Sequence, residues 1–131
     1  MLFRSIAGTG SNDTRSTIQL TREAKTLGVD GVLLVGPYYN KPTQEGHFQH
    51  YAAIADAVDI SMIMYNVPGR TGSNMLAETQ LRIAEYSQLF VATKEASANL
   101  EQMQEIIRSA PDHFSLLSGD DSLAQIGRAH V

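Results

Sequence analysis

The chain has 131 residues, enough for one domain with a real core but too few for two. Ten Lys and Arg residues against fourteen Asp and Glu give a net charge of −4, which argues against nucleic acid or an anionic membrane as the main partner. No apolar run approaches the roughly 18 residues of a membrane-spanning helix. The lack of cysteine excludes disulfides, thiolate catalysis and cysteine-based zinc sites, and we expect a cytoplasmic globular protein.

Short apolar runs alternate with segments of helical periodicity. We predict strands at 5–7, 31–35, 60–65, 89–94 and 114–117. Four helices are predicted between the strands. The first has Asn12 or Asp13 as its N-cap and Leu20, Ala24 and Leu27 on one face. The other three have apolar stripes over 48–58, 76–83 and 100–107. Strict alternation predicts a parallel sheet covered by helices, either doubly wound or a (β/α) barrel.

In either architecture ligands bind at the carboxyl ends of the strands. Lys94 follows a buried strand, and burial destabilises an ammonium, so this lysine can present a neutral amine that forms a Schiff base with a carbonyl. The alternative is a lysine paired with Glu95 or extended to the sheet edge. Tyr65 ends the preceding strand and should lie beside Lys94, as a proton relay or as a core tyrosine with its hydroxyl at the rim.

Arg70 lies in a loop, 66–72, whose proline and two glycines predict a fixed turn. A guanidinium there can hold a carboxylate in a bidentate manner, or it can simply face solvent. Tyr38 and Tyr39 fit a hydrophobic loop pair, an interface anchor or a catalytic phenol, and local reasoning favours the first two.

Three further patterns favour structural roles. The segment Gly8-Thr9-Gly10 begins like a dinucleotide-binding turn, but position 13 is Asp rather than Gly. His47 and His50 have no partner at metal-ligand spacing, so a solvated helix face is expected. Asp120 and Asp121 favour capping of a following helix over cation binding. No metal is therefore predicted.

Six segments together resemble one family. They are residues 6–12 (IAGTGSN), 37–42 (PYYNKP), 44–46 (QEG), 65–72 (YNVPGRTG), 94–96 (KEA) and 117–121 (LSGDD). In this order and spacing they are similar to the dihydrodipicolinate synthase family, part of the pyruvate-dependent class I aldolase superfamily that includes N-acetylneuraminate lyase. The resemblance runs from about Arg4 to Leu123.

The resemblance implies a function for several residues. Lys94 would form the Schiff base with pyruvate, Tyr65 would belong to a proton relay, and Tyr39 would complete that relay in a neighbouring subunit. Arg70 would bind the carboxylate of aspartate semialdehyde, and its presence favours the synthase over sialic-acid lyases. Gly119 is assigned to substrate binding by the same match.

Regulation follows less directly from the resemblance. Tyr38 and Asn12 match positions that line an allosteric lysine pocket in feedback-inhibited members. Ser16 stands where some such members carry an acidic residue, which argues against inhibition by lysine. No cofactor is implied, because the iminium itself serves as the electron sink.

The family fold is a (β/α)₈ barrel of about 250 residues, usually in tetramers built from tight dimers. Residues 1–125 would supply about five strands and four helices, family strands 3 to 7, and 126–131 read as a non-native tail. The family's Gly-Thr-Thr-Gly-Glu loop has no counterpart, so we expect an inactive fragment of a synthase. The alternatives are a sister aldolase acting on a sugar-derived 2-keto acid and a non-catalytic, doubly wound ligand-binding domain.

Overall fold

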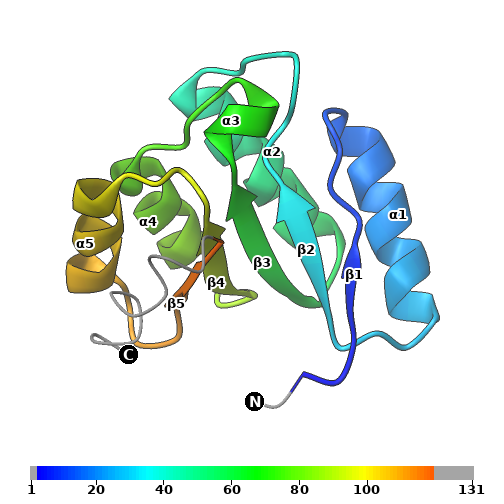
Figure 1. Ribbon diagram of the computed structural model, residues 1–131. Helices are drawn as coiled ribbons and strands as arrows, with labels where there is room; N and C mark the ends of the chain where they lie inside the picture. The colour runs from blue at the N-terminus through cyan, green and yellow to red at the C-terminus, as the bar shows by residue number, and fades with distance from the viewer. Residues whose placement is uncertain (1–2, 120–131) are drawn as a thin grey trace.

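The computed structural model describes residues 3–119, so Asp120, Asp121 and the predicted tail 126–131 lie outside the described residues. Five strands alternate with helices along this part of the chain (Figure 1). The elements are β1 (Ile6–Gly8), α1 (Thr14–Thr26), β2 (Gly31–Val35), α2 (Gln44–Ala57), β3 (Ser61–Asn66), α3 (Pro68–Thr71), α4 (Ala77–Tyr86), β4 (Phe90–Glu95), α5 (Leu100–Ser109) and β5 (Ser115–Ser118). Among residues 3–119, no helix has both the length and the apolar character that crossing a membrane requires.

The sheet is parallel and its strands pair in sequence order, β1-β2-β3-β4-β5. Helix α1 packs on α2, α2 on α4, and α4 on α5, so the four longer helices form one row on one side of the sheet (Figure 1). A doubly wound sheet reverses its strand order and carries helices on both faces. Sequential order with one row of helices is the arrangement of a (β/α) barrel, which decides between the two predicted architectures.

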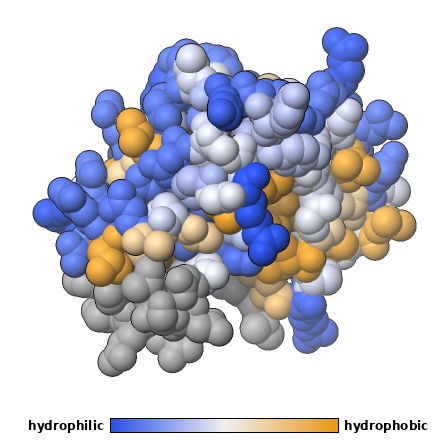
Figure 2. Space-filling view, turned by 45° about the horizontal axis from the view of Figure 1, so that its top comes forward, coloured by the Kyte–Doolittle hydropathy of each residue, from blue (hydrophilic) through white to orange (hydrophobic). Residues whose placement is uncertain are grey.

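The helix-facing side of the sheet carries the core. Val32 and Leu34 of β2, Met62 and Met64 of β3, and Phe90 of β4 are buried there. The other face is partly open and holds a cavity of about 440 Å³, lined by Phe3, Ile6, Ile63, Val91, Ala92, His113, Ser115 and Leu117. Patches of hydrophobic residues accordingly interrupt a largely polar surface (Figure 2). In a closed barrel this face is the interior.

Four predicted strands begin and end one residue later than expected, whereas Gly31–Val35 matches its prediction. The shift adds Asn66 to the end of β3 and Glu95 to the end of β4. The loop after β3, predicted as a fixed turn, includes the single helical turn α3 in addition to the four predicted helices. The shift matters for the site, because it makes Tyr65 and Lys94 the penultimate residues of their strands.

The predicted apolar face of α1 is wrong for Leu20 and Leu27, which are exposed, the latter by 84%. Its buried residues are Thr17, Thr21 and Ala24, and Asp13 rather than Asn12 is the N-cap. The threonines can be buried because their hydroxyls are satisfied: Thr21 Oγ1 donates to the carbonyl oxygen of Thr17 at 2.7 Å. A rule that keeps polar residues out of the core does not anticipate this pairing.

Candidate active site

Lys94 and Tyr65 are direct partners in the pairing of β4 with β3, and the prediction that they lie side by side is confirmed. The Lys94 Nζ atom lies 4.5 Å from the centre of the Tyr65 ring. Both side chains are half-buried and lie on the sheet face opposite the helices, near the carboxyl ends of their strands. The amine and the phenol therefore lie together at the carboxyl-end edge of the sheet, where parallel α/β folds bind ligands.

The alternative that Lys94 pairs with Glu95 does not hold. Side chains alternate along a strand, so Glu95 points to the helix side, where it is 1% exposed. Its carboxylate accepts hydrogen bonds from neutral groups, the shortest from Asn66 Nδ2 at 2.6 Å. Within residues 3–119, Lys94 forms no ion pair. The Glu95 carboxylate is thus not a partner of the Lys94 amine.

A β-bulge sets the register that places these residues together. Met62 of β3 pairs with Phe90 of β4, but the next residue, Ile63, pairs with Ala92, so β4 carries one extra residue at Val91. Val91 and Ala92 consequently both line the cavity on the open face. The sequence pattern contains no signal for this irregularity.

Arg70 lies in α3 and lines an open groove of about 820 Å³ together with Tyr38, Tyr39 and Lys41. The side chain is exposed, and within the described residues the structure gives it no acidic partner. The groove brings together two loops that the sequence placed separately, 37–42 and 66–72, joined by a hydrogen bond from the backbone nitrogen of Tyr39 to the carbonyl oxygen of Thr71 at 3.2 Å. Arg70 and Tyr39 therefore belong to one surface.

Tyr39 adopts a left-handed backbone conformation with φ of 72°, and the backbone nitrogen of Asn40 donates to the carbonyl oxygen of Tyr38 at 2.8 Å. This is a tight three-residue turn that a tyrosine occupies at a cost of about 1–3 kcal/mol. It directs a side chain that is 87% exposed away from the body of the chain. The structure thus does not bring Tyr39 to Tyr65 within the same chain.

Asn12 lies against the same loop. The Asn40 side-chain amide donates to the carbonyl oxygen of Asn12 at 2.7 Å, and Asn12 Nδ2 donates to Asn40 Oδ1 at 3.4 Å. The structure therefore ties Asn12 to the loop of Tyr38. Ser16 donates to the N-cap carboxylate of Asp13 through both its backbone nitrogen and its hydroxyl.

Gly119 follows β5, and its backbone nitrogen donates to the carbonyl oxygen of Glu95 at 2.8 Å. A Cβ atom at this position would lie 2.6 Å from the Cβ of Ala96. Only glycine fits this close approach between the ends of β4 and β5. Gly119 is thus at the predicted end of the sheet, in contact with the segment that follows Lys94.

The prediction of a solvated face for His47 and His50 is wrong: they are 1% and 5% exposed. His50 Nδ1 lies 2.7 Å from Thr14 Oγ1, and His47 Nε2 lies 2.9 Å from Ser73 Oγ. Burial lowers the pKa of both, and that of His50 falls to about 4, with His47 adding a smaller effect. They are neutral packing residues that join α2 to α1 and to the loop after α3.

The Gly8-Thr9-Gly10 segment also has a structural role. A Cβ on Gly10 would lie 2.4 Å from the backbone nitrogen of Val35, so the glycine permits the loop to pack against the end of β2. This close approach, rather than a dinucleotide, explains the residue.

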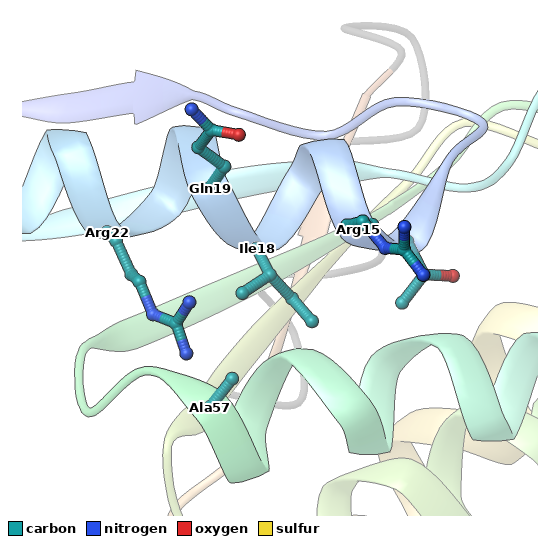
Figure 3. A pocket seen from close by; sticks show the side chains of 6 residues that line it. Arg15, Ile18, Gln19, Arg22 and Ala57 are labelled. Atoms are coloured by element: carbon teal, nitrogen blue, oxygen red, sulfur yellow. The ribbon is translucent and has the colours of Figure 1, made fainter.

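A second groove, of about 540 Å³, lies between α1 and α2. Arg15, Ile18 and Arg22 follow one another along α1, and Ala57 of α2 faces them (Figure 3). None of the predicted site residues lines this groove, so it is separate from the edge that carries Lys94.

Comparison with known proteins decides the family. A model described as the dihydrodipicolinate synthetase family matches residues 4–127. The chain belongs to this family. Its (β/α)₈ barrel accounts for the sequential parallel sheet and for the position of Lys94 at the carboxyl end of β4.

Individual relatives agree with this assignment. The 4-hydroxy-tetrahydrodipicolinate synthase 1 of Halalkalibacterium halodurans is 56% identical over 118 residues, which cover 90% of this chain and 40% of that protein. A crystal structure of the Cyanidioschyzon merolae synthase with lysine bound matches with a TM-score of 0.91 at 50% identity, over 95% of this chain and 42% of that one. A monomeric dihydrodipicolinate synthase variant matches with the same TM-score at 41% identity, over 95% of this chain and 43% of that one. The chain therefore spans about two fifths of the length of these relatives.

Sequence reasoning missed the residues on the helix side of the site. Asn66 and Glu95 each follow a predicted site residue directly, and they form the next pair along β3 and β4. Two amide side chains, Gln80 of α4 and Gln102 of α5, reach the same carboxylate. The only signal for them is the position of Asn66 and Glu95 at the end of apolar strands, where a polar residue that faces the helices must find partners.

Proposed function

We propose that the protein carrying this chain condenses pyruvate with aspartate semialdehyde to give 4-hydroxy-tetrahydrodipicolinate, for lysine and diaminopimelate biosynthesis. The observation that carries the proposal is the pairing of Lys94 with Tyr65 at the carboxyl ends of adjacent barrel strands, with Nζ 4.5 Å from the ring centre. The relatives named 4-hydroxy-tetrahydrodipicolinate synthase support this reaction. A location in the cytoplasm belongs to the same proposal.

In this mechanism the neutral Lys94 amine attacks the ketone carbon of pyruvate and forms a carbinolamine. A proton delivered to its hydroxyl, by way of Tyr65, releases water and leaves an iminium. Loss of a proton from the methyl carbon gives an enamine, because the iminium accepts the electron pair. The enamine carbon then adds to the aldehyde, and the amino group of the second substrate displaces Lys94 as the ring closes.

Two groups would complete the site. Arg70 would bind the carboxylate of aspartate semialdehyde from the groove it shares with Tyr39, since a guanidinium offers two parallel donors to a carboxylate. Tyr39 would act in the site of a neighbouring subunit within a homotetramer of tight dimers, which its exposed, outward-directed side chain supports. The existence of a monomeric variant among the relatives makes this assembly a point to test.

The test is borohydride reduction of the full-length protein in the presence of pyruvate. We expect a stable pyruvate adduct on Lys94, detected by peptide mass spectrometry, and no adduct in Lys94→Arg. An adduct on another residue, or none at all, would contradict the mechanism. The sister aldolases use the same imine, so turnover with aspartate semialdehyde is compared with turnover of sialic and 2-keto-3-deoxy acids to separate the substrates.

We also propose that the 131-residue chain alone is inactive. The support is that Tyr39 does not reach Tyr65 within the chain, and that β1 and β5 each pair with a single strand among the described residues. Synthase turnover by the isolated chain would overturn this proposal.

A further inference from the structure

The most deeply buried charged group among the described residues is the carboxylate of Glu95, on the helix side of β4. It accepts four hydrogen bonds, all from neutral groups. The donors are Asn66 Nδ2 (2.6 Å) and Gln80 Nε2 (3.3 Å) to Oε1, and Gln102 Nε2 (2.9 Å) and Ser97 Oγ (3.2 Å) to Oε2. A buried carboxylate without a cation is costly unless its lone pairs are filled, and these donors occupy both oxygens.

The donors come from separate elements, so Glu95 connects them. Asn66 ends β3, Gln80 lies in α4 and Gln102 in α5. The backbone carbonyl of Glu95 also accepts the Gly119 nitrogen after β5, at 2.8 Å. One residue thereby joins the carboxyl ends of three adjacent strands to the two helices that cover them.

The position of this junction bears directly on Lys94. The bulge at Val91 displaces β4 by one residue relative to β3. Without that displacement Thr93, not Lys94, would stand opposite Tyr65. A slip of one residue also exchanges the two faces of a strand. To keep the bulged register, the two strands therefore need a further interaction after the bulge. The pair Asn66–Glu95, next to Tyr65–Lys94, supplies one.

We propose that Glu95 is a positioning residue for the Schiff-base lysine. Its carboxylate holds β4 in the bulged register against β3, so that Lys94 stays opposite Tyr65, and it does so from the side of the sheet that the substrate does not reach. This inference rests on the proposed role of Lys94.

The role depends on acceptors facing donors, not on the charge at position 95 as such. An exchange of the acid and the amide, Glu95→Gln with Gln102→Glu, tests this distinction. The amide oxygen introduced at position 95 would still accept from Asn66 and Gln80, and the new amide nitrogen would donate to the carboxylate introduced at position 102. That carboxylate would also accept from the Asn74 amide that now bonds Gln102. The exchange keeps the net charge and most of the hydrogen bonds, but it loses the bond from Gln102 Nε2 to Asn74 Oδ1 and the one that Ser97 Oγ donates to Oε2 of Glu95.

The experiment uses the full-length protein and compares Glu95→Leu, the exchange variant and Ile106→Ala. Glu95→Leu removes both side-chain acceptor oxygens, and we expect kcat to fall on the order of a hundredfold, the scale of a displacement of about 1 Å at a reacting group. KM for aspartate semialdehyde should change less than about threefold. The exchange variant should keep kcat within about threefold of wild type. Ile106→Ala truncates the buried core of α5 and controls for lost stability alone.

Crystal structures give a readout that does not depend on activity. We expect Thr93 to approach Tyr65, or β4 to lose its order, in Glu95→Leu, and the wild-type register in the exchange variant. The proposal is overturned if Glu95→Leu keeps Lys94 opposite Tyr65, if its kcat falls no more than that of Ile106→Ala at equal melting temperature, or if the exchange variant behaves like Glu95→Leu. Absence of a pyruvate adduct in the wild type would refute the proposed function instead, and the register comparison would still decide the role of Glu95.

Discussion

The Nζ atom of Lys94 lies 4.5 Å from the centre of the Tyr65 ring, and the two residues are opposite each other in adjacent parallel strands. The ring packs against the Lys94 side chain and restricts where its amine can lie. The same ring holds its hydroxyl on the side of the sheet where a substrate bound to Lys94 would lie. One tyrosine can therefore orient the amine and exchange protons with the intermediate.

Tyr65→Phe separates these two contributions, because it keeps the ring and removes the hydroxyl. We expect kcat to fall by about 10²–10⁴-fold, the usual contribution of a positioned acid or base. The borohydride-trapped adduct should still form, only more slowly, and the melting temperature should stay within about 2 °C. If the variant forms no trapped adduct and its melting temperature also falls well below that of the wild type, a role in proton transfer is contradicted.

Arg70→Ala should weaken the binding of aspartate semialdehyde and leave the reaction with pyruvate unaffected. Loss of a charge-assisted, bidentate contact corresponds to about 1.5–3 kcal/mol, hence a rise of about 10–100-fold in KM for aspartate semialdehyde. Formation of the pyruvate adduct should be unchanged, because it precedes the aldehyde. Arg82, which pairs with Glu45 at 2.8 Å outside the groove, provides the control: Arg82→Ala should leave both steps intact.

Complementation tests whether Tyr39 acts across a subunit boundary. Tyr39→Phe and Lys94→Arg are each expected to be nearly inactive. After mixed refolding, half of the dimers are hybrids, and each hybrid holds one site with both Lys94 and the partner's Tyr39 intact. Recovery of about one quarter of wild-type activity is therefore expected for a two-fold symmetric interface. No recovery, with hybrids verified by mass, would place Tyr39 in its own chain's site or outside catalysis.

Gly119→Ala should destabilise the protein by about 1–3 kcal/mol, because the new methyl group would overlap the Ala96 side chain. Removing the opposing methyl group in the double variant with Ala96→Gly should recover most of the loss. Gly69→Ala is the matched control, since a Cβ there meets nothing within 4 Å. Urea unfolding of these three variants and of Ala96→Gly alone checks the expectation, and additive losses in the double variant would contradict it.

The buried His50 predicts a dependence of stability on pH. Its pKa falls from 6.5 to about 4 on folding, chiefly through burial and then through His47, opposed by Asp13. Between these values the unfolded chain binds a proton that the folded chain does not, so stability is full above about pH 6.5 and declines as the pH falls towards 4. The decline amounts to about 3 kcal/mol.

Urea unfolding of the wild type and His50→Gln at pH 7 and pH 5 measures this dependence. The variant should lose much of the slope, and the remainder should come from His47, whose pKa is also lowered by burial. A wild-type slope that His50→Gln leaves unchanged would assign the effect to other groups.

Much of the site could be predicted from local sequence. Lys94 and Tyr65 close apolar strands that occur in βα alternation, and parallel strands bring such ends together. His47 and His50 were misassigned because helical periodicity cannot tell a buried neutral imidazole from a solvated one. Their hydroxyl partners, Ser73 and Thr14, lie 26 and 36 residues away in the chain.

The sequence by itself determined the order of strands and helices and the family. It also singled out Lys94, Tyr65 and Arg70 as candidate site residues. Tertiary structure alone decided the sheet order, which excludes a doubly wound fold, and the bulge at Val91 that sets Lys94 opposite Tyr65. It also brought together the donors around Glu95, which come from the end of β3, from just after β4 and from helices α4 and α5. Hydrophobic periodicity reports which residues leave water, whereas register and hydrogen-bond partners depend on groups distant in sequence that meet only in the folded chain.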